Sequence, residues 1–396
     1  MKRLRLTTAG ESHGPGLTAV LSGMPAGLAI DFAAVAHQME RRMHGHGRGA
    51  RMKIEADEVE LRGGLRGGVT LGSPIALWIA NRDFKSWEQI MSPVANDAER
   101  SEKRRLRSPR PGHADLAGGI KYLRHDLRDV LERASARETA ARVAAGALAR
   151  QLLAHFGIEI ASGVRSLGPL GADRPVPAWA EVAAVDDSSP LRAIDRELET
   201  EMVDLVDRTA RDGDTLGGAV TVIAHNVPAG LGSHVHFDEK LDGRLARAVM
   251  SVPAVKAVEI GAALDASRGP GSTAHDPIEH DGTGWRRPSN HAGGIEGGIT
   301  NGEDVVITAY KKPISTLRRG LPSVDLDTLE PHSSQYERSD VTALPAAGVV
   351  AEAMVALVLA DALLEKTGGD SMEEVEAHFA ATLRQQGDWP RRESDR

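Results

Sequence analysis

The sequence predicts an α+β fold with long buried helices. A run with alternating apolar residues, Arg3–Thr8, indicates a β-strand close to the N-terminus. The segment Asp126–Phe156 is rich in alanine, which favours a long helix that neighbouring elements can approach closely. The apolar run Val349–Leu364 contains Glu352 and Asp361 and is too short to span a bilayer, so it indicates a buried helix.

Further strands and helices follow along the chain. Strands are predicted at Leu17–Leu21, Met52–Val59, Leu71–Asn81, Gly217–Asn226 and Val305–Tyr310. Helices are predicted from the N-cap Asp31 to Arg42, at Leu191–Arg211, at Asp238–Met250 and from about Leu344. No internal repeat or clear linker separates these elements in the sequence, so we expect one domain over residues 1–385 and a frayed, charged tail over residues 386–396.

The composition argues against several classes of protein. Of the 396 residues 41% are hydrophobic but 3% are aromatic, so the core is expected to be aliphatic. The net charge of −8 argues against a general binder of nucleic acid or membrane surfaces. The absence of cysteine excludes disulfides, thiolate metal sites and cysteine nucleophiles. Because the segment Met1–Leu6 lacks an apolar signal core, we expect a cytoplasmic protein.

The loop around His113 is the first candidate site. Two prolines restrict the backbone on either side of Arg110, and Gly112 permits a tight turn with His113 at its apex. The imidazole then lies between the guanidinium groups of Arg107 and Arg110 and the carboxylate of Asp115. A single loop histidine is usually just solvated, so this loop needs support from elsewhere in the chain.

That support comes from His13, which lies in the equally constrained loop Gly10–Gly14. Small residues flank Glu11, Ser12 and His13, so backbone and side chains can approach a ligand closely. The alternative is a glycine-rich hairpin with polar tips. Two histidines in constrained loops favour a site for proton transfer near neutral pH.

Three basic segments could hold an anionic ligand. The first is a loop that carries Arg41, Arg42, Arg48 and Arg51, which suits bidentate binding of carboxylates or phosphates. The second, Arg100–Arg110, is either a solvated loop or an electropositive lid. In the third, Glu132–Thr139, Ser135 lies between Arg133 and Arg137 at the start of a helix. A surface ladder of ion pairs is the alternative for this third segment.

The second half of the chain adds two loops and one carboxylate. Gly293–Gly302 offers up to five glycine backbones to a ligand, and Lys311–Thr316 combines lysines, hydroxyls and amides as a phosphate cradle would. Neither segment contains the P-loop pattern. Asp340 is explained most simply as a helix cap. We expect no metal site, because His44 and His46 lack a carboxylate partner at helical spacing.

Taken together, seven of these motifs resemble the chorismate synthase family in order and spacing, from residue 3 to about residue 366. The motifs are Gly10–Gly14, Arg41–Met52, Arg110–Asp115, Glu132–Thr139, Gly293–Gly298, Lys312–Thr316 and Arg338–Asp340. His46 departs from the family pattern, which often has an aromatic residue there.

The resemblance implies a fold, an assembly and a reaction. The fold would be a β-α-β sandwich with long helices between two antiparallel sheets, and the assembly a homotetramer. The reaction would be the 1,4-elimination of phosphate from 5-enolpyruvylshikimate-3-phosphate to give chorismate, the last common step of the shikimate pathway. It would make the protein a carbon–oxygen lyase that needs reduced FMN without net redox change, with NADPH as a possible reductant.

The resemblance also implies roles for residues. His13 would protonate the leaving phosphate, His113 would lie near the flavin ring, and Asp340 would assist proton removal at the flavin N5. FMN would be bound by Arg133, Ala134, Ser135, Pro253, Ala254, Gly297, Lys312, Pro313, Ile314, Ser315, Thr316 and Arg338. Arg42 and Arg48 would hold NADP or a substrate anion, and the substrate would contact Ser12, Arg51, Arg107 and Arg137.

Two other functions remain open from the sequence. An FMN-dependent oxidoreductase acting on an anionic substrate would use the same loops but consume hydride in step with product. An RNA-binding or assembly protein would use Arg100–Arg110 and lose affinity steeply with salt. The acidic net charge and the lack of interleaved aromatic residues count against this second alternative, so we expect neither nucleic-acid nor membrane partners.

Overall fold

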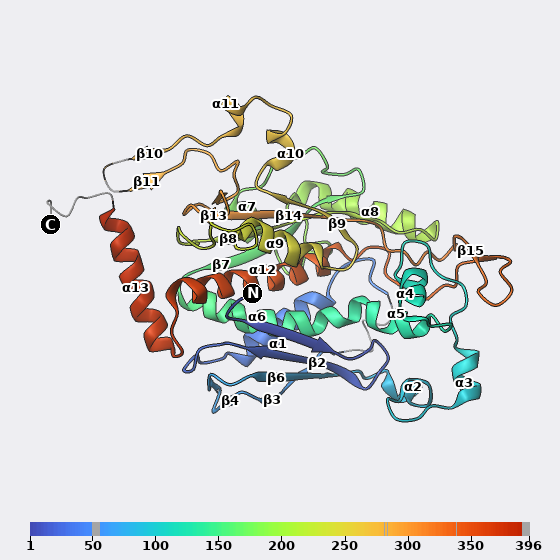
Figure 1. Cartoon of the computed structure of the whole chain (residues 1–396). Helices are drawn as coiled ribbons and strands as arrows, with labels where there is room; N and C mark the ends of the chain where they lie inside the picture. The colour runs from blue at the N-terminus through green and yellow to red at the C-terminus, as the bar shows by residue number, and fades with distance from the viewer. Residues whose placement is uncertain (50–55, 281, 283, 338, 390–396) are drawn as a thin grey trace.

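The computed structural model describes residues 1–49, 56–280, 282, 284–337 and 339–389. Two four-stranded antiparallel sheets enclose a layer of helices (Figure 1). One aliphatic cluster runs through all three layers, with members from both sheets and from the helices between them. The predicted α+β class and the β-α-β sandwich implied by the family resemblance are confirmed.

The first sheet has the strand order β1-β2-β6-β3. Its strands are β1 (Arg5–Ala9), β2 (Gly16–Ser22), β6 (Ile75–Ala80) and β3 (Val59–Gly63). Half of the strand predicted at Met52–Val59 lies outside the described residues. In the other half the prediction was wrong, because only Val59 belongs to a strand, β3. The strand predicted at Leu71–Asn81 begins later, because Gly72 has a φ of +77° in the turn between β6 and the short strands β4 (Leu65–Arg66) and β5 (Val69–Thr70).

The second sheet has the strand order β7-β8-β14-β9. Its strands are β7 (Glu159–Leu167), β8 (Gly218–His225), β14 (Val305–Lys311) and β9 (Val255–Ile260). Alternate residues of β14 face opposite sides of the sheet. Val305, Ile307 and Ala309 join the main core, whereas Val306 belongs to a small cluster on the outer face.

The helix layer consists of α1 (Phe32–Met43), α6 (Thr139–His155), α12 (Leu344–Thr367) and α9 (Leu241–Met250). Helices α6 and α12 approach closely at Gly146, where an added Cβ would lie 2.4 Å from the Cβ of Ala353. The buried helix predicted at Val349–Leu364 is confirmed, but α12 extends beyond that run and with 24 residues is long and apolar enough to cross a membrane. Its burial, at 94% of the most apolar window, identifies it as a core helix.

The helix predicted over Asp126–Phe156 is interrupted. Helix α5 (Arg128–Ala134) is followed by the 3-10 turn η2 (Ala136–Glu138) and then by α6. Ser135 between them is extended, with φ −64° and ψ 142°, and its hydroxyl accepts a hydrogen bond from the amide of Arg137. This side-chain cap replaces the helical bonds that would otherwise continue through the segment.

The helix predicted over Leu191–Arg211 is also shorter than expected. Helix α8 (Arg196–Arg211) begins after Asp195, whose carboxylate accepts hydrogen bonds from the amides of Glu197 and Leu198. The remaining helices are α2 (Phe84–Met91), α3 (Ala98–Lys103), α4 (Asp115–Tyr122), α7 (Trp179–Ala183), α10 (Ala263–Ala266), α11 (Gly271–Ala274) and α13 (Met372–Asp388).

Short hairpins complete the fold. They are β10 (Glu279–His280) with β11 (Trp285–Arg286), β12 (Ile295–Glu296) with β13 (Ile299–Thr300), and β15 (Pro322–Val324) with β16 (Pro331–Ser333). Helices α4 and α5 and strand β15 gather at one end of the sandwich, on the right in Figure 1. Most of the candidate residues belong to the segments at this end.

Candidate active site

His13 lies in the loop between β1 and β2 and is held on two sides. Its Nδ1 lies 2.9 Å from Oε1 of Glu132, and its backbone amide donates to Oε2 of the same residue at 2.8 Å. Its ring stacks on Trp87, with centroids 4.1 Å apart. Because Glu132 occupies Nδ1, the other ring nitrogen, Nε2, is the one placed to exchange a proton with a ligand.

Glu132 is buried, with a side chain that is 1% exposed. Arg128 holds it at 3.2 Å and also reaches Glu337 at 3.0 Å. Burial alone would raise the pKa of Glu132, but the hydrogen bonds and charge of His13 and the charge of Arg128 outweigh it and lower that pKa. Glu132 therefore stays ionised and accepts the Nδ1–H of His13.

His113 is held by a second arrangement of the same kind. Its Nδ1 contacts the carboxylate of Asp115, which is fully buried. Arg110 donates to that carboxylate through Nε at 2.7 Å and through Nη2 at 2.9 Å. Burial raises the pKa of Asp115, but the bonds from His113 and Arg110 outweigh it and hold the pKa well below its usual range.

The turn that carries His113 has the geometry that its sequence predicts, but one expected neighbour lies elsewhere. Gly112 has a φ of +80°, which places His113 beside Arg110. Arg107 instead pairs with Glu102 and, at 3.3 Å, with Asp327. Its charge is thus already balanced by two carboxylates.

The loop after β14 packs directly against the His113 turn. The Lys312 ammonium and the Ser315 hydroxyl both donate to the carbonyl of Gly112. The backbone amide of Lys312 donates to the carbonyl of Ala254 at 2.9 Å. Three segments far apart in sequence, around residues 112, 254 and 312–316, therefore meet at one place.

Thr316 joins this group to Asp340. Its hydroxyl accepts a hydrogen bond from Arg110 at 2.9 Å, and its carbonyl accepts one from the hydroxyl of Ser339 at 2.8 Å. The Asp340 carboxylate accepts the amide of Gly49 at 2.7 Å and lies 3.4 Å from Nε of Arg48. The prediction that Asp340 caps a helix was wrong, because the N-cap of α12 is Ala343 and has no side-chain cap. The Asp340 carboxylate instead holds the arginine loop.

Buried arginines connect this region to the His13 loop. Arg42 and Arg137 share the carboxylate of Asp57, with Arg42 at 2.7 Å. Arg137 also donates to the side chain of Asn81 at 2.9 Å, and Asn81 donates to the carbonyl of Gly14 at 2.7 Å. Burial lowers the pKa of Arg42 to about 10, with nearby Arg137 and Arg48 adding to the effect and Asp57 opposing it.

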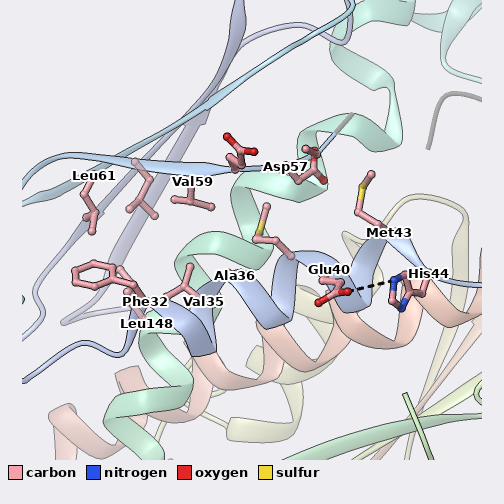
Figure 2. A pocket seen from close by; sticks show the side chains of 14 residues that line it. Phe32, Val35, Ala36, Glu40, Met43, His44, Asp57, Val59, Leu61 and Leu148 are labelled. Carbon is pink, nitrogen blue, oxygen red and sulfur yellow. Dashed lines mark ion pairs between the residues drawn. The ribbon is translucent and has the colours of Figure 1, made fainter. Parts of the chain in front are cut away.

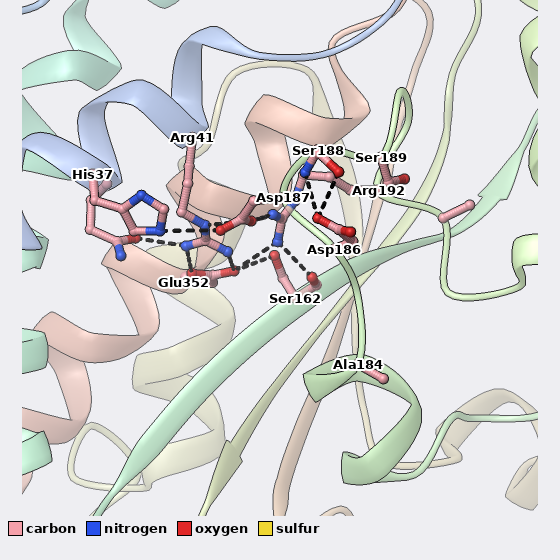
Figure 3. Close-up of polar contacts among 12 residues, drawn as sticks. His37, Arg41, Ser162, Ala184, Asp186, Asp187, Ser188, Ser189, Arg192 and Glu352 are labelled. Carbon is pink, nitrogen blue, oxygen red and sulfur yellow. Dashed lines mark hydrogen bonds and ion pairs between the residues drawn. The ribbon is translucent and has the colours of Figure 1, made fainter.

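Arg41, the neighbour of Arg42 in α1, points away from this group. It pairs with Glu352 at 2.6 Å and with Asp187 at 2.9 Å (Figure 3). Arg150 and Arg192 also pair with Glu352. Burial raises the pKa of Glu352, but Arg41 and Arg150 outweigh it and bring the pKa to about 2. Arg41 therefore stabilises the fold through these ion pairs, whereas the sequence predicts that it binds an anionic ligand.

The remaining predicted residues have varied positions. Arg133 donates to the carbonyls of Thr8 and Gly10. Gly297 lies in the exposed turn between β12 and β13, at the end of the sandwich opposite α4 (Figure 1). The structure does not bring it to the other candidates among the described residues. Arg51 and Arg338 lie outside the described residues.

Two cavities border the arginine group. One, of about 630 Å³, lies between α1 and β3, with apolar walls and Asp57 among its lining residues (Figure 2). The other, of about 530 Å³, is lined by Arg48, Gly49 and the segment 187–190. The ion pairs of Asp57 and Asp340 therefore lie next to space that a ligand could reach.

Sequence reasoning missed several residues that shape the site. The sequence gives Glu132 no role beyond the start of the segment Glu132–Thr139, and it assigns none to Asp57, Asn81, Trp87 and Arg128. His13 and Glu132 are 119 positions apart in the sequence, so no local pattern shows their contact. Asp57 has a φ of +47°, and the sequence does not predict this left-handed backbone conformation either.

The site defined by these contacts has paired histidine–carboxylate groups beside buried cations, which suits acid–base chemistry on an anionic small molecule. A sequence model of chorismate synthase matches residues 4–364. Chorismate synthase of Geobacter sulfurreducens is 52% identical over 388 residues, with 96% of this chain and 98% of the relative covered. That of Moorella thermoacetica is 53% identical over 379 residues, with the same coverage.

A solved structure agrees with the sequence relatives. The crystal structure of a chorismate synthase superposes with a TM-score of 0.77 and 41% sequence identity, and covers 98% of this chain and 99% of that one. The chain belongs to the chorismate synthase family and is a lyase.

Proposed function

We propose that this protein eliminates phosphate from 5-enolpyruvylshikimate-3-phosphate to give chorismate, with reduced FMN as cofactor. The observation that carries the proposal is the pairing of His13 with Glu132 and of His113 with Asp115, beside the buried cations Arg42 and Arg137. Paired histidines serve proton transfer, and clustered guanidinium groups serve the binding of anions.

The proposed substrate carries two carboxylates and one phosphate. Arg42, Arg48 and Arg137 supply permanent positive charge, which the carboxylates of Asp57 and Asp340 balance in part. Because these arginines are buried, their interaction with an incoming anion is screened less than it would be at the surface. The same two residues, Arg42 and Arg48, are our candidates for a contact with NADPH.

Protons move through three groups in the proposed reaction. Phosphate leaves more readily if a donor meets it, and Nε2 of His13 is placed for that role because Nδ1 is engaged by Glu132. Asp340 assists removal of the ring proton. His113, with Nδ1 fixed by Asp115, presents its other nitrogen to the cofactor.

The residues present suit FMN by the chemistry of their donors. Lys312, Ser315 and Thr316 combine an ammonium and two hydroxyls in one loop, which suits a phosphate, and this loop contacts the His113 turn directly. Arg133, in the last turn of α5, and Ser135, the N-cap of the 3-10 turn, are proposed to bind the same cofactor. Bound reduced FMN would lend electron density as the C–O bond breaks and recover it afterwards.

An anaerobic assay tests this proposal. Purified protein, reduced FMN and 5-enolpyruvylshikimate-3-phosphate should give free phosphate and diene absorbance together, with reductant needed only in catalytic amount. Consumption of one hydride per product would instead support the FMN-dependent oxidoreductase. We also propose a homotetramer, supported by family membership, which light scattering would show as four times the 42.1 kDa chain mass.

A further inference from the structure

Lys311 is a buried lysine at the end of β14, and the proposed function assigns it no role. It is 8% exposed. It alternates with Ile307 and Ala309, so it lies on the core side of the sheet, whereas Lys312 reaches the carbonyl of Gly112. An ammonium group is rarely buried so far without a partner, because its desolvation must be offset.

Among the described residues, no hydrogen bond or ion pair to a protein group holds the Lys311 ammonium. Three charged groups act on it, namely the carboxylate of Asp340 and the cations of Arg48 and Lys312. Its Nζ is not completely enclosed. A buried cation beside the arginine loop that has no partner among the described residues is suited to bind an anion.

We propose that Lys311 is a further ligand-binding residue of this site, which donates to a carboxylate or phosphate of the bound substrate or cofactor. The inference rests on the proposed function for the identity of the ligand. Its geometry is separate from that of Lys312, which follows the end of β14 and donates to the carbonyl of Gly112.

The charge state of Lys311 gives the proposal a specific signature. Burial lowers the pKa of Lys311 to about 8, an effect that Asp340 opposes and that Arg48 and Lys312 reinforce. An anion bound to the amine favours the charged form and raises this pKa. Binding above pH 7 therefore takes up protons, and this uptake grows as the pH rises toward the pKa of the free protein.

Titration calorimetry of the full chain tests the signature. 5-Enolpyruvylshikimate-3-phosphate and FMN are titrated separately at pH 6.5 and 8.5, each in two buffers that differ in ionisation enthalpy. With wild type we expect proton uptake at pH 8.5 for one of the two ligands, and that ligand identifies the source of the anion. Lys311→Met should bind it about tenfold more weakly and without the uptake.

Lys311→Arg and Lys366→Met serve as comparison variants. Arginine keeps the charge but does not titrate, so affinity should recover while proton uptake stays absent. Lys366 is exposed near the C-terminal end of α12, and its variant should behave as wild type. A purely structural role for Lys311 would change thermal stability without altering proton uptake.

The outcomes separate this inference from the proposed function. Equal affinity and equal proton uptake in wild type and Lys311→Met, for both ligands, would overturn the role of Lys311 even if wild type releases phosphate normally. Loss of affinity and uptake in Lys311→Met would support that role even if wild type fails to release phosphate, and in that case only the proposed reaction would fall.

Discussion

Nδ1 of His13 lies 2.9 Å from Oε1 of Glu132, a carboxylate that is itself buried and held by Arg128. His113 and Asp115 form the same arrangement, in which Arg110 holds the carboxylate of Asp115 as Arg128 holds that of Glu132. In each case an arginine fixes the carboxylate and the carboxylate fixes one nitrogen of the ring. The tautomer of both histidines is thus set by residues that need not touch the substrate.

Removing the charge of Glu132 should impair His13. We expect Glu132→Gln to reduce phosphate release about 100-fold, since a positioned proton donor contributes at least that much and glutamine does not stabilise the cationic ring. Stopped-flow measurement of phosphate would check this. Glu376→Gln is a matched control, because Glu376 pairs with His155 at 2.8 Å on the surface. Equal rates for Glu132→Gln and wild type would contradict the assignment.

Asp115 should make stability depend on acid pH. Its pKa is lower in the folded protein than in the unfolded chain, so the stability it contributes is present above about pH 4 and is lost as the pH falls further. Asp115→Asn should lower the free energy of unfolding at pH 7 by about 3 kcal/mol, because it leaves Arg110 without its buried partner. Urea unfolding at pH 7 and pH 3.5 measures both effects, and the difference between variant and wild type should shrink at the lower pH.

Arg42 should strengthen the binding of the substrate. We expect Arg42→Gln to raise the KM for 5-enolpyruvylshikimate-3-phosphate about tenfold, because a charge-assisted hydrogen bond is lost. Steady-state kinetics would check this against Arg62→Gln, which removes an exposed arginine that pairs with Glu60. An unchanged KM, with loss of reduction by NADPH alone, would assign Arg42 to the nucleotide instead.

Arg133 and Ser135 should matter for flavin retention. The double variant Arg133→Ala with Ser135→Ala is expected to raise the Kd for FMN about tenfold through the loss of donors to an anion. Fluorescence titration of FMN measures this directly. Arg124→Ala is the comparison, since Arg124 is exposed and pairs loosely with Asp129 at 3.7 Å. Unchanged FMN affinity would show that the cofactor is bound elsewhere.

The contact between α6 and α12 leaves no room for an added methyl group. Gly146→Ala should lower the free energy of unfolding by about 2 kcal/mol, because its Cβ would lie 2.4 Å from that of Ala353. Gly387→Ala in α13 is the control, because a Cβ there meets nothing within 4 Å. Urea denaturation should show a lower midpoint for Gly146→Ala alone, and equal midpoints would mean that the helices separate readily.

Much of the fold could be read from the sequence, because hydrophobic periodicity reports burial. Strands β1, β2, β6, β8 and β14 and the long helix α12 follow from apolar patterns. Strands β7 and β9 were not predicted, and β3 shares only Val59 with the predicted strand Met52–Val59. The break in the helix at Ser135 could not be predicted, because helix propensity is high on both sides of it. A single hydrogen bond to the Ser135 side chain interrupts the helix there. The apolar run Val349–Leu364 is also shorter than α12, because periodicity does not mark where a fully buried helix begins or ends.

The site was predictable where residues that act together lie in one short motif. The turn from Arg110 to Asp115 is such a case, since its hydrogen bonds span at most five residues. The contact between His13 and Glu132 depends on the packing of α5 against the β1–β2 loop. Arg41 and Arg42 show most clearly what the sequence cannot predict. Their side chains are adjacent and chemically identical, but Arg41 pairs with Glu352 and Arg42 with Asp57.

The different directions of Arg41 and Arg42 have a mechanical consequence. Arg41 fastens the last turn of α1 to Glu352 in the centre of α12, and through Glu352 to α6 and β7. A ligand that binds Arg42 therefore cannot shift the end of α1 unless the contacts of Glu352 with the other elements change as well. We expect displacement on binding to fall instead on the loop that carries Arg48, which follows α1 and which Asp340 holds at Gly49 and Arg48.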